Sequence, residues 1–172
     1  NFISPEFVPQ LNAVFERMES AITLKVHSAG DDKGNDLVGA MNELANLTDK
    51  LKVEVTSEGE HLPFVEFIRA DGSATGMAFH GVPGGHEFNS FILGFYNASG
   101  RGQPIDEADL NAVKAIDKPL DLKILISLSC TMCPDLVVAS QRMAALSPKV
   151  KTHVYDVGLF PDLRSQYKVM SV

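Results

Sequence analysis

Cys130 and Cys133 are the only cysteines in the 172 residues of this chain, and two residues separate them. An apolar run, residues 123–128, leads into the pair, and a helix-like run, residues 135–146, follows it. This order indicates a strand, a sharp turn and the start of a helix. Two thiols at this spacing can close a disulfide with little backbone movement. The pattern therefore predicts dithiol–disulfide redox chemistry.

The expected helix start favours Cys130 as the nucleophile. Unpaired N–H groups and the helix dipole at an N-terminus stabilise a thiolate, which lowers the pKa of a nearby thiol. Cys133 would lie deeper in the turn and act as the resolving thiol. Pro134 fits the first turn, because an N–H there would have no helical partner. Thr131 and Met132 are uncharged, so the helix must supply most of the pKa change.

Two other interpretations of the cysteine pair are weaker. A zinc site usually needs four ligands, and the five histidines show no spacing that would complete one. A purely structural disulfide would close a very small loop, which constrains the unfolded chain little. We therefore expect a redox pair and no metal site.

Charge and composition exclude several classes of protein. The formal net charge is −7, from 22 acidic and 15 basic residues, which argues against binding to nucleic acid or to an anionic membrane. No apolar stretch approaches the length of a membrane span, and no segment has the pattern of a signal peptide. A single close cysteine pair fits a reducing compartment, so we expect a cytoplasmic protein.

Hydrophobic periodicity predicts alternating helices and strands along the chain. The expected helices are residues 5–18, 36–50, 86–98, 107–116, 130–146 and 160–167. The expected strands are residues 21–27, 51–56, 64–68, 75–80, 120–128 and 150–155. Residues 70–73 mark a hairpin turn, and residues 99–104 form a polar, glycine-bearing connector.

The order helix, strand, helix, strand occurs on both sides of that connector. We therefore expect one unit at residues 1–100 without cysteines and a second at residues 101–172 that carries the Cys-x-x-Cys. In the first unit, residues 28–31 replace the cysteine pair with Ser-Ala-Gly-Asp. Parallel strand–helix–strand units of this kind predict an α/β protein with two tandem thioredoxin-like folds, in which helices flank a mixed central sheet. The second fold lacks a hairpin and a last helix, so it is expected to be incomplete.

Three stretches carry a resemblance to a known family: residues 127–135 with 143–148, residues 85–90 (Gly-His-Glu-Phe-Asn-Ser) and residues 167–172. On these stretches the whole chain resembles the N-terminal domain of the alkyl hydroperoxide reductase flavoprotein subunit (AhpF), a fused pair of thioredoxin-like folds. The family often has His-Asn between the cysteines, whereas this chain has Thr131 and Met132. The family also continues into a cis-proline directly after the stretch that matches residues 167–172.

The resemblance implies a disulfide relay. NADH reduces FAD, FAD reduces a thioredoxin-reductase-like module, and that module reduces the Cys-x-x-Cys, which in turn reduces a two-cysteine peroxiredoxin (AhpC). Cys130 would attack the peroxiredoxin disulfide, and Cys133 would resolve the mixed disulfide. These residues contain no Gly-x-Gly-x-x-Gly motif. FAD and NADH are therefore expected on a C-terminal part or on a separate reductase.

The resemblance also implies a catalytic role for Glu87, which would face the redox pair from the first unit. A carboxylate there could take or give a cysteine proton and would raise the pKa of a nearby thiol. The alternative is a helix N-terminal glutamate stabilised by the dipole alone. His86 is left without a role, and Pro63 is interpreted as the structural counterpart of the family's cis-proline.

Two other functions stay open on the sequence. One is a stand-alone protein disulfide oxidoreductase of broader substrate range, resembling archaeal proteins that also pair two thioredoxin-like units. The other is an interaction module that is not an enzyme, in which the first unit binds a partner and the cysteines are incidental.

Overall fold

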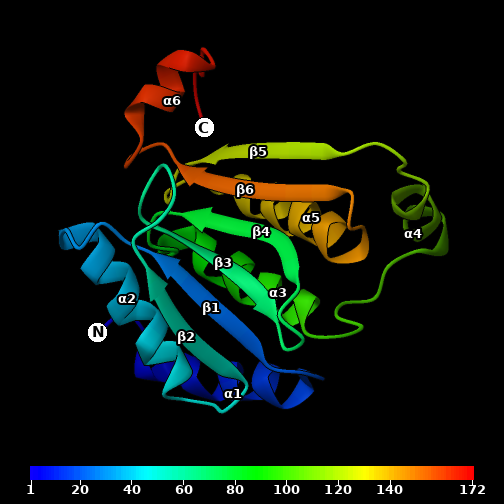
Figure 1. The fold of residues 1–172 in the computed structure, drawn as a ribbon, viewed down its shortest axis with the longest axis horizontal. Helices are drawn as coiled ribbons and strands as arrows, with labels where there is room; N and C mark the ends of the chain where they lie inside the picture. Colours follow the sequence, from blue (N-terminus) through cyan, green and yellow to red (C-terminus); the bar gives the residue numbers. More distant parts are fainter.

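The computed structural model describes residues 1–172, and its six strands form one mixed sheet in the order β2-β1-β3-β4-β6-β5 (Figure 1). The strands are β1 (Ile22–His27), β2 (Leu51–Thr56), β3 (Phe64–Arg69), β4 (Ala74–His80), β5 (Leu120–Ile126) and β6 (Val150–Asp156). The helices are α1 (Val8–Arg17), α2 (Asp32–Ala45), α3 (Phe88–Ala98), α4 (Glu107–Lys114), α5 (Cys133–Leu146) and α6 (Pro161–Gln166), with 3-10 turns η1 (Pro5–Phe7) and η2 (Gly85–Glu87).

Parallel pairing of β4 with β6 joins the two halves of the chain into this one sheet. All strands except β3 run in the same direction, because β3 pairs antiparallel with both β1 and β4. The carboxyl ends of β1, β2, β4, β5 and β6 therefore meet at one edge, where their arrowheads lie in Figure 1. The predicted mixed sheet flanked by helices is confirmed. The division at residue 100 stays a prediction.

Alternation along the strands builds the main hydrophobic core. In β1, Ile22, Leu24 and Val26 are fully buried in a cluster that also takes apolar side chains from α1, α2, α3 and α5. Figure 1 shows α3 and α5 lying behind β3, β4 and β6. Burial of these side chains drives the folding of the sheet against the helices, as expected for a face with a period of two residues.

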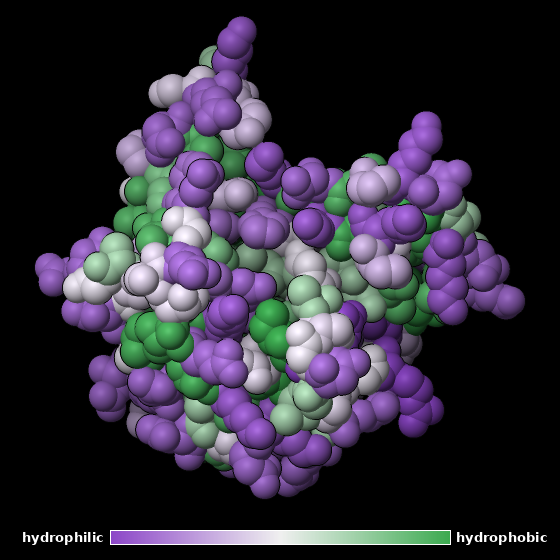
Figure 2. Space-filling model, in the orientation of Figure 1, coloured by the Kyte–Doolittle hydropathy of each residue, from purple (hydrophilic) through white to green (hydrophobic).

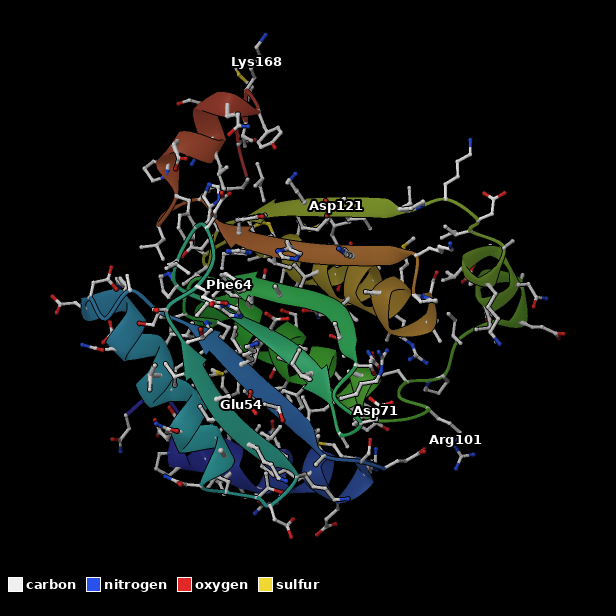
Figure 3. The ribbon with its side chains drawn as sticks, in the orientation of Figure 1. Glu54, Phe64, Asp71, Arg101, Asp121 and Lys168 are labelled. Atoms are coloured by element: carbon white, nitrogen blue, oxygen red, sulfur yellow. A yellow bond between two sulfur atoms is a disulfide. The ribbon has the colours of Figure 1, made fainter.

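The alternate positions of the same strands carry a stack of rings, which we call the ring ladder: His27, Phe64, His80 and Tyr155. Neighbouring ring centres lie 4.0 Å, 4.5 Å and 4.1 Å apart across β1, β3, β4 and β6. Phe64 lies near the carboxyl edge of the sheet (Figure 3). The ladder thus covers part of the sheet face that α3 and α5 leave free.

Hydrogen bonds at His80 define its tautomer. His80 Nδ1 lies 2.9 Å from the backbone oxygen of His61, so Nδ1 must donate. His80 Nε2 then accepts from His153 Nδ1, also at 2.9 Å. Burial lowers the pKa of His80 to about 3, so the ring is neutral at neutral pH.

β5 forms an outer edge of the sheet, since β6 is its only strand partner. Its outer side lies between α6 and α4, where the outline of the molecule is hollowed (Figures 1 and 2). None of the helices combines the length and the apolar content needed to cross a membrane.

Two expected helix starts were wrong. α2 begins at Asp32 rather than at residue 36, because the Asp31 side chain accepts a hydrogen bond from Gly34 N–H at 2.9 Å and caps the helix earlier. α5 begins at Cys133 rather than at Cys130. Residues 127–130 form a turn instead, closed by a hydrogen bond from Cys130 N–H to the Ser127 oxygen at 3.0 Å, and residues 131–132 bend into the helix. The expected end of α2 at residue 50 was also wrong, because the helix ends at Ala45. The remaining strands and helices lie within a few residues of their expected bounds.

Candidate redox site

Cys130 and Cys133 form a disulfide with their Cα atoms 5.6 Å apart, within the usual range for bonded cysteines. Cys130 lies in the loop between β5 and α5, and Cys133 is the first residue of α5, at the carboxyl edge of the sheet. Ile126 fixes the start of this loop, because its side chain is fully buried and its oxygen accepts from Val157 N–H at 2.9 Å. Two of the strands that end at this edge, β5 and β6, thus position the redox pair.

The backbone at the start of α5 favours negative charge on Cys130. Cys133 N–H points at Cys130 Sγ over 3.2 Å, and it is one of the N–H groups that a helix start leaves without a helical partner. After reduction, this donor and the helix dipole would stabilise a Cys130 thiolate. Thr131 and Met132 are exposed beside it, Met132 by 79%. Cys133 packs against the main core, as expected for the deeper thiol.

Glu87 is a fully buried carboxylate at the end of η2. Its Oε1 accepts from the Ser90 hydroxyl at 2.5 Å, whereas its Oε2 has no hydrogen-bond partner. Burial raises the pKa of Glu87 above the usual range for a glutamate. The site therefore contains a carboxyl group that keeps its proton to higher pH than an exposed one.

The segment that holds Glu87 lies directly against the redox loop. His86 N–H donates to the Leu128 oxygen at 3.0 Å. Gly85 has φ +55°, and a Cβ there would lie 2.6 Å from the same oxygen, so only glycine fits without movement. On α5, the Gln141 amide donates to the Ser90 oxygen at 2.9 Å. Proton exchange between Glu87 and the cysteines stays a prediction.

A second carboxylate at this edge, Asp156, is half-buried. The sequence-based prediction missed it. It ends β6 opposite Ile126, the last residue of β5. Its Oδ1 accepts from Gly158 N–H at 2.9 Å, and burial raises its pKa. With Lys33 and Leu128 it lines a cavity of about 140 Å³. The sequence did contain a signal for Asp156, because it is an acidic residue at the carboxyl end of the strand that pairs with β5.

The corresponding loop of the first half carries no thiol. Ser28 Oγ there accepts from Gly30 N–H at 3.0 Å, and Asp31 caps α2. The Leu62–Pro63 peptide bond is cis, in keeping with the role expected for Pro63. No group of three or more histidine, cysteine, aspartate or glutamate side chains is arranged to hold a metal ion.

Comparison with known proteins finds relatives that match nearly the whole chain, although no family model matches it. An NADH dehydrogenase of Ferdinandcohnia aciditolerans is 32% identical over 170 residues, which is 99% of this chain and 32% of that protein. The AhpF protein of alkyl hydroperoxide reductase from Pseudomonas aeruginosa is 31% identical over 163 residues, 95% of this chain and 31% of that protein. The chain thus spans about a third of the length of the curated relatives it matches.

Solved structures agree with this result. The NTD_N/C domain of alkylhydroperoxide reductase AhpF from Enterococcus faecalis superposes with a TM-score of 0.92 at 32% identity, covering 99% of this chain and 87% of that one. A protein disulfide oxidoreductase from Aeropyrum pernix superposes with a TM-score of 0.82 at 20% identity, covering 98% of this chain and 81% of that one, and shows the shared fold.

A Cys-x-x-Cys disulfide before a helix, on a mixed sheet of this topology, defines a thioredoxin-like dithiol–disulfide domain. Within that class, the chain belongs to the family of the AhpF N-terminal domain, as the resemblance in the sequence indicated. Both the fold class and the family expected from the sequence are confirmed.

Proposed function

We propose that this domain carries electrons as a dithiol from a flavoprotein disulfide centre to the disulfide of a two-cysteine peroxiredoxin, for the reduction of hydroperoxides. The hydrogen bond from Cys133 N–H to Cys130 Sγ carries the proposal, because it prepares one sulfur of the pair as a nucleophile. Membership of the AhpF family supports the choice of donor and acceptor.

The exchange takes place in two balanced steps. The Cys130 thiolate attacks one sulfur of the partner disulfide, forms a mixed disulfide and displaces the other partner sulfur as a thiolate. Cys133 then loses its proton and attacks Cys130 Sγ, which releases the partner as a dithiol and closes the Cys130–Cys133 disulfide. Two electrons pass to the partner, and a dithiol of the flavoprotein returns them by the same chemistry in reverse. Glu87 is the proposed group for taking or giving a thiol proton.

FAD and NADH supply the electrons in this scheme and would be bound outside these residues. The chain spans about a third of its curated relatives, which leaves the greater part of such a protein to hold them. The chain itself has no Gly-x-Gly-x-x-Gly motif for a dinucleotide. Its own contribution is the dithiol, the helix start that activates it and the surface that meets each partner.

Single cysteine variants test the order of attack. Incubated with an oxidised two-cysteine peroxiredoxin, Cys133→Ser should accumulate a covalent mixed disulfide, because the resolving thiol is absent. Cys130→Ser should accumulate at least tenfold less, since Cys133 lies deeper and packs against the core. Intact-mass spectrometry under non-reducing conditions measures both adducts. Equal trapping by the two variants would contradict the assignment of Cys130 as the nucleophile.

Substrate preference separates this function from a broad disulfide oxidoreductase. The wild-type domain, reduced beforehand, should reduce the peroxiredoxin far faster than insulin at equal disulfide concentration. Comparable rates would favour the broader activity instead. Thiols that never form a reversible disulfide in a glutathione titration would rule out both redox functions.

A further inference from the structure

An aromatic groove opens on the first half of the chain, between its N-terminal segment and the start of α3. We call it the Phe88 groove. It consists of a cavity of about 380 Å³ and an adjoining one of about 230 Å³. The two cavities share Phe7, Phe88 and Asn89. The rest of the lining is Phe2, Gly84, Gly85 and His86 in the larger cavity and Gln10, Leu11, Val14, Ile92 and Leu93 in the smaller.

Contacts on both sides hold the walls of the groove in place. The Phe88 ring lies at its centre, 5.4 Å from the ring of Phe2 and 6.1 Å from that of Phe7, measured between centroids. The Glu43 carboxylate accepts from the N–H groups of Phe2 and Ile3, at 2.8 and 3.2 Å, and so fixes the N-terminal segment against α2. Phe7 nevertheless keeps 38% of its surface exposed.

The groove adjoins the redox loop. Two of its lining residues, Gly85 and His86, contact Leu128, which precedes Cys130 by two residues. Since consecutive Cα atoms are about 3.8 Å apart, the Cα atoms of Leu128 and Cys130 are separated by at most about 7.6 Å. A mixed disulfide would hold the partner cysteine within about 7 Å of Cys130, again between Cα atoms. The partner cysteine then lies within about 15 Å of Leu128, so residues that flank it are within reach of the groove.

The chemistry of the groove selects apolar groups. No aspartate, glutamate, lysine or arginine lines either cavity, although the chain has a net charge of −7. Covering Phe7 and Phe88 removes apolar surface from water, which stabilises an apolar occupant. An extended segment advances about 3.3 Å per residue. A side chain two or three residues from the partner cysteine can therefore span the separation between Cys130 and Leu128.

We propose that the Phe88 groove receives a large apolar side chain from the segment that flanks the reactive cysteine of the disulfide partner. This inference rests on the proposed disulfide exchange at Cys130. It adds a recognition surface that the sequence motif does not contain. The groove lies on the half of the chain without cysteines, so that half contributes specificity, whereas the other half contributes the thiols.

The test compares three disulfide substrates. Two are peptides that differ only in having Phe or Gly three residues from the reactive cysteine, and the third is a small aromatic disulfide without any flanking segment. Phe7→Ala should lower kcat/KM for the Phe peptide and for the peroxiredoxin by about tenfold, the size expected for losing part of one apolar side-chain contact. The Gly peptide and the small disulfide should react at the wild-type rate.

Two further variants make the result specific. Asn89→Asp places a charge in both cavities without removing apolar packing, and the dipole of α3 tolerates an acid there, so the fold should persist. It should reproduce the loss seen with Phe7→Ala. Leu120→Ala is the matched control. Leu120 is also 38% exposed, but it begins β5 and so lies at the end of that strand away from the redox loop. It should leave all rates unchanged.

The outcomes separate the groove from the relay. Equal loss on all substrates, or no loss on the Phe peptide in either groove variant, would overturn the groove proposal. A wild-type domain that fails to reduce the peroxiredoxin but reduces both peptides would overturn the relay alone, and the peptide comparison would still decide the groove.

Discussion

Glu87 combines burial, an unpartnered oxygen and a position next to the redox loop. Its Oε2 forms no hydrogen bond, and burial raises the pKa of its carboxyl group, which holds a proton more strongly in the folded protein than in the unfolded chain. Because the folded pKa lies above the unfolded one, this residue favours folding below the ordinary glutamate pKa. The advantage is lost as the pH rises from that value through the folded pKa.

Glu87→Gln removes this titration. The variant should therefore gain stability relative to the wild type as the pH rises from about 4.5 to 8, by up to about 1–3 kcal/mol if the unpartnered oxygen bears the full cost of burial. Urea unfolding at several pH values measures the difference. Glu54→Gln is the control, since Glu54 is exposed on β2, and it should track the wild type. A gain that does not vary with pH would contradict the titration of Glu87.

The same variant tests the proton role. A carboxylate near Cys130 raises the pKa of that thiol, so Glu87→Gln should shift the alkylation profile of reduced Cys130 to lower pH. An unchanged profile with a changed stability would leave Glu87 a structural residue.

At the scale of the elements, the ring ladder ties four strands together, and it contains a buried histidine, His80, that is neutral at neutral pH. The His80 ring stacks on Tyr155, lies tilted against Phe64, and faces His61, His153 and His27. Its pKa falls from the usual value for histidine to about 3, because burial penalises the imidazolium ion. Burial also lowers the pKa of His153.

His80→Gln should flatten the acid side of the stability profile. In the wild type, the unfolded chain binds a proton at His80 below about pH 6.5 and the folded chain does not, so stability falls by about 1.4 kcal/mol per pH unit toward pH 3. The variant is less stable at pH 7, because it loses ring stacking, but should lose less on going to pH 5. Thermal unfolding at pH 7 and pH 5, with His86→Gln as an exposed control, checks this. Parallel losses in the variant and the wild type would contradict it.

Local patterns predicted most elements well, because each depends on residues close in sequence. Alternation in residues 51–56 predicted β2 without error. The start of α2 was misplaced because Asp31 caps it from within a polar stretch that looked like a loop. The redox pair could be found from two residues. The Phe88 groove could not be predicted, since it brings together residues from the two ends of the first half. The ring ladder could not be predicted either, since it joins residues of both halves.

For the whole molecule, the decisive contact is the pairing of β4 with β6, which merges the halves into one sheet. Gly76 begins this junction with φ +78°, and a Cβ there would lie 2.7 Å from the Val150 oxygen on β6. Gly72 has φ +87°, and a Cβ added there would meet no atom within 4 Å. The two glycines share the backbone conformation and differ in what they face.

Gly76→Ala should therefore destabilise the protein more than Gly72→Ala. The left-handed backbone costs either variant about 1–2 kcal/mol, and the clash with Val150 adds about 1–3 kcal/mol only in the first. Each kcal/mol lowers Tm by about 2–4 °C in a domain of this size. Calorimetry should show one cooperative transition in both variants. Two separated transitions in Gly76→Ala would show that residues 1–100 and 101–172 unfold independently.

The chain has one pair of cysteine sulfurs, at one position on the edge of the sheet. In the proposed relay, the electron donor and the electron acceptor must therefore occupy the same place in turn, never together. Turnover then follows a double-displacement scheme, in which each partner leaves before the other arrives. An oxidised flavoprotein centre or a reduced peroxiredoxin can occupy the same place without productive exchange, and so competes with the productive partner. The flux through this domain therefore depends on the ratio of the two partners.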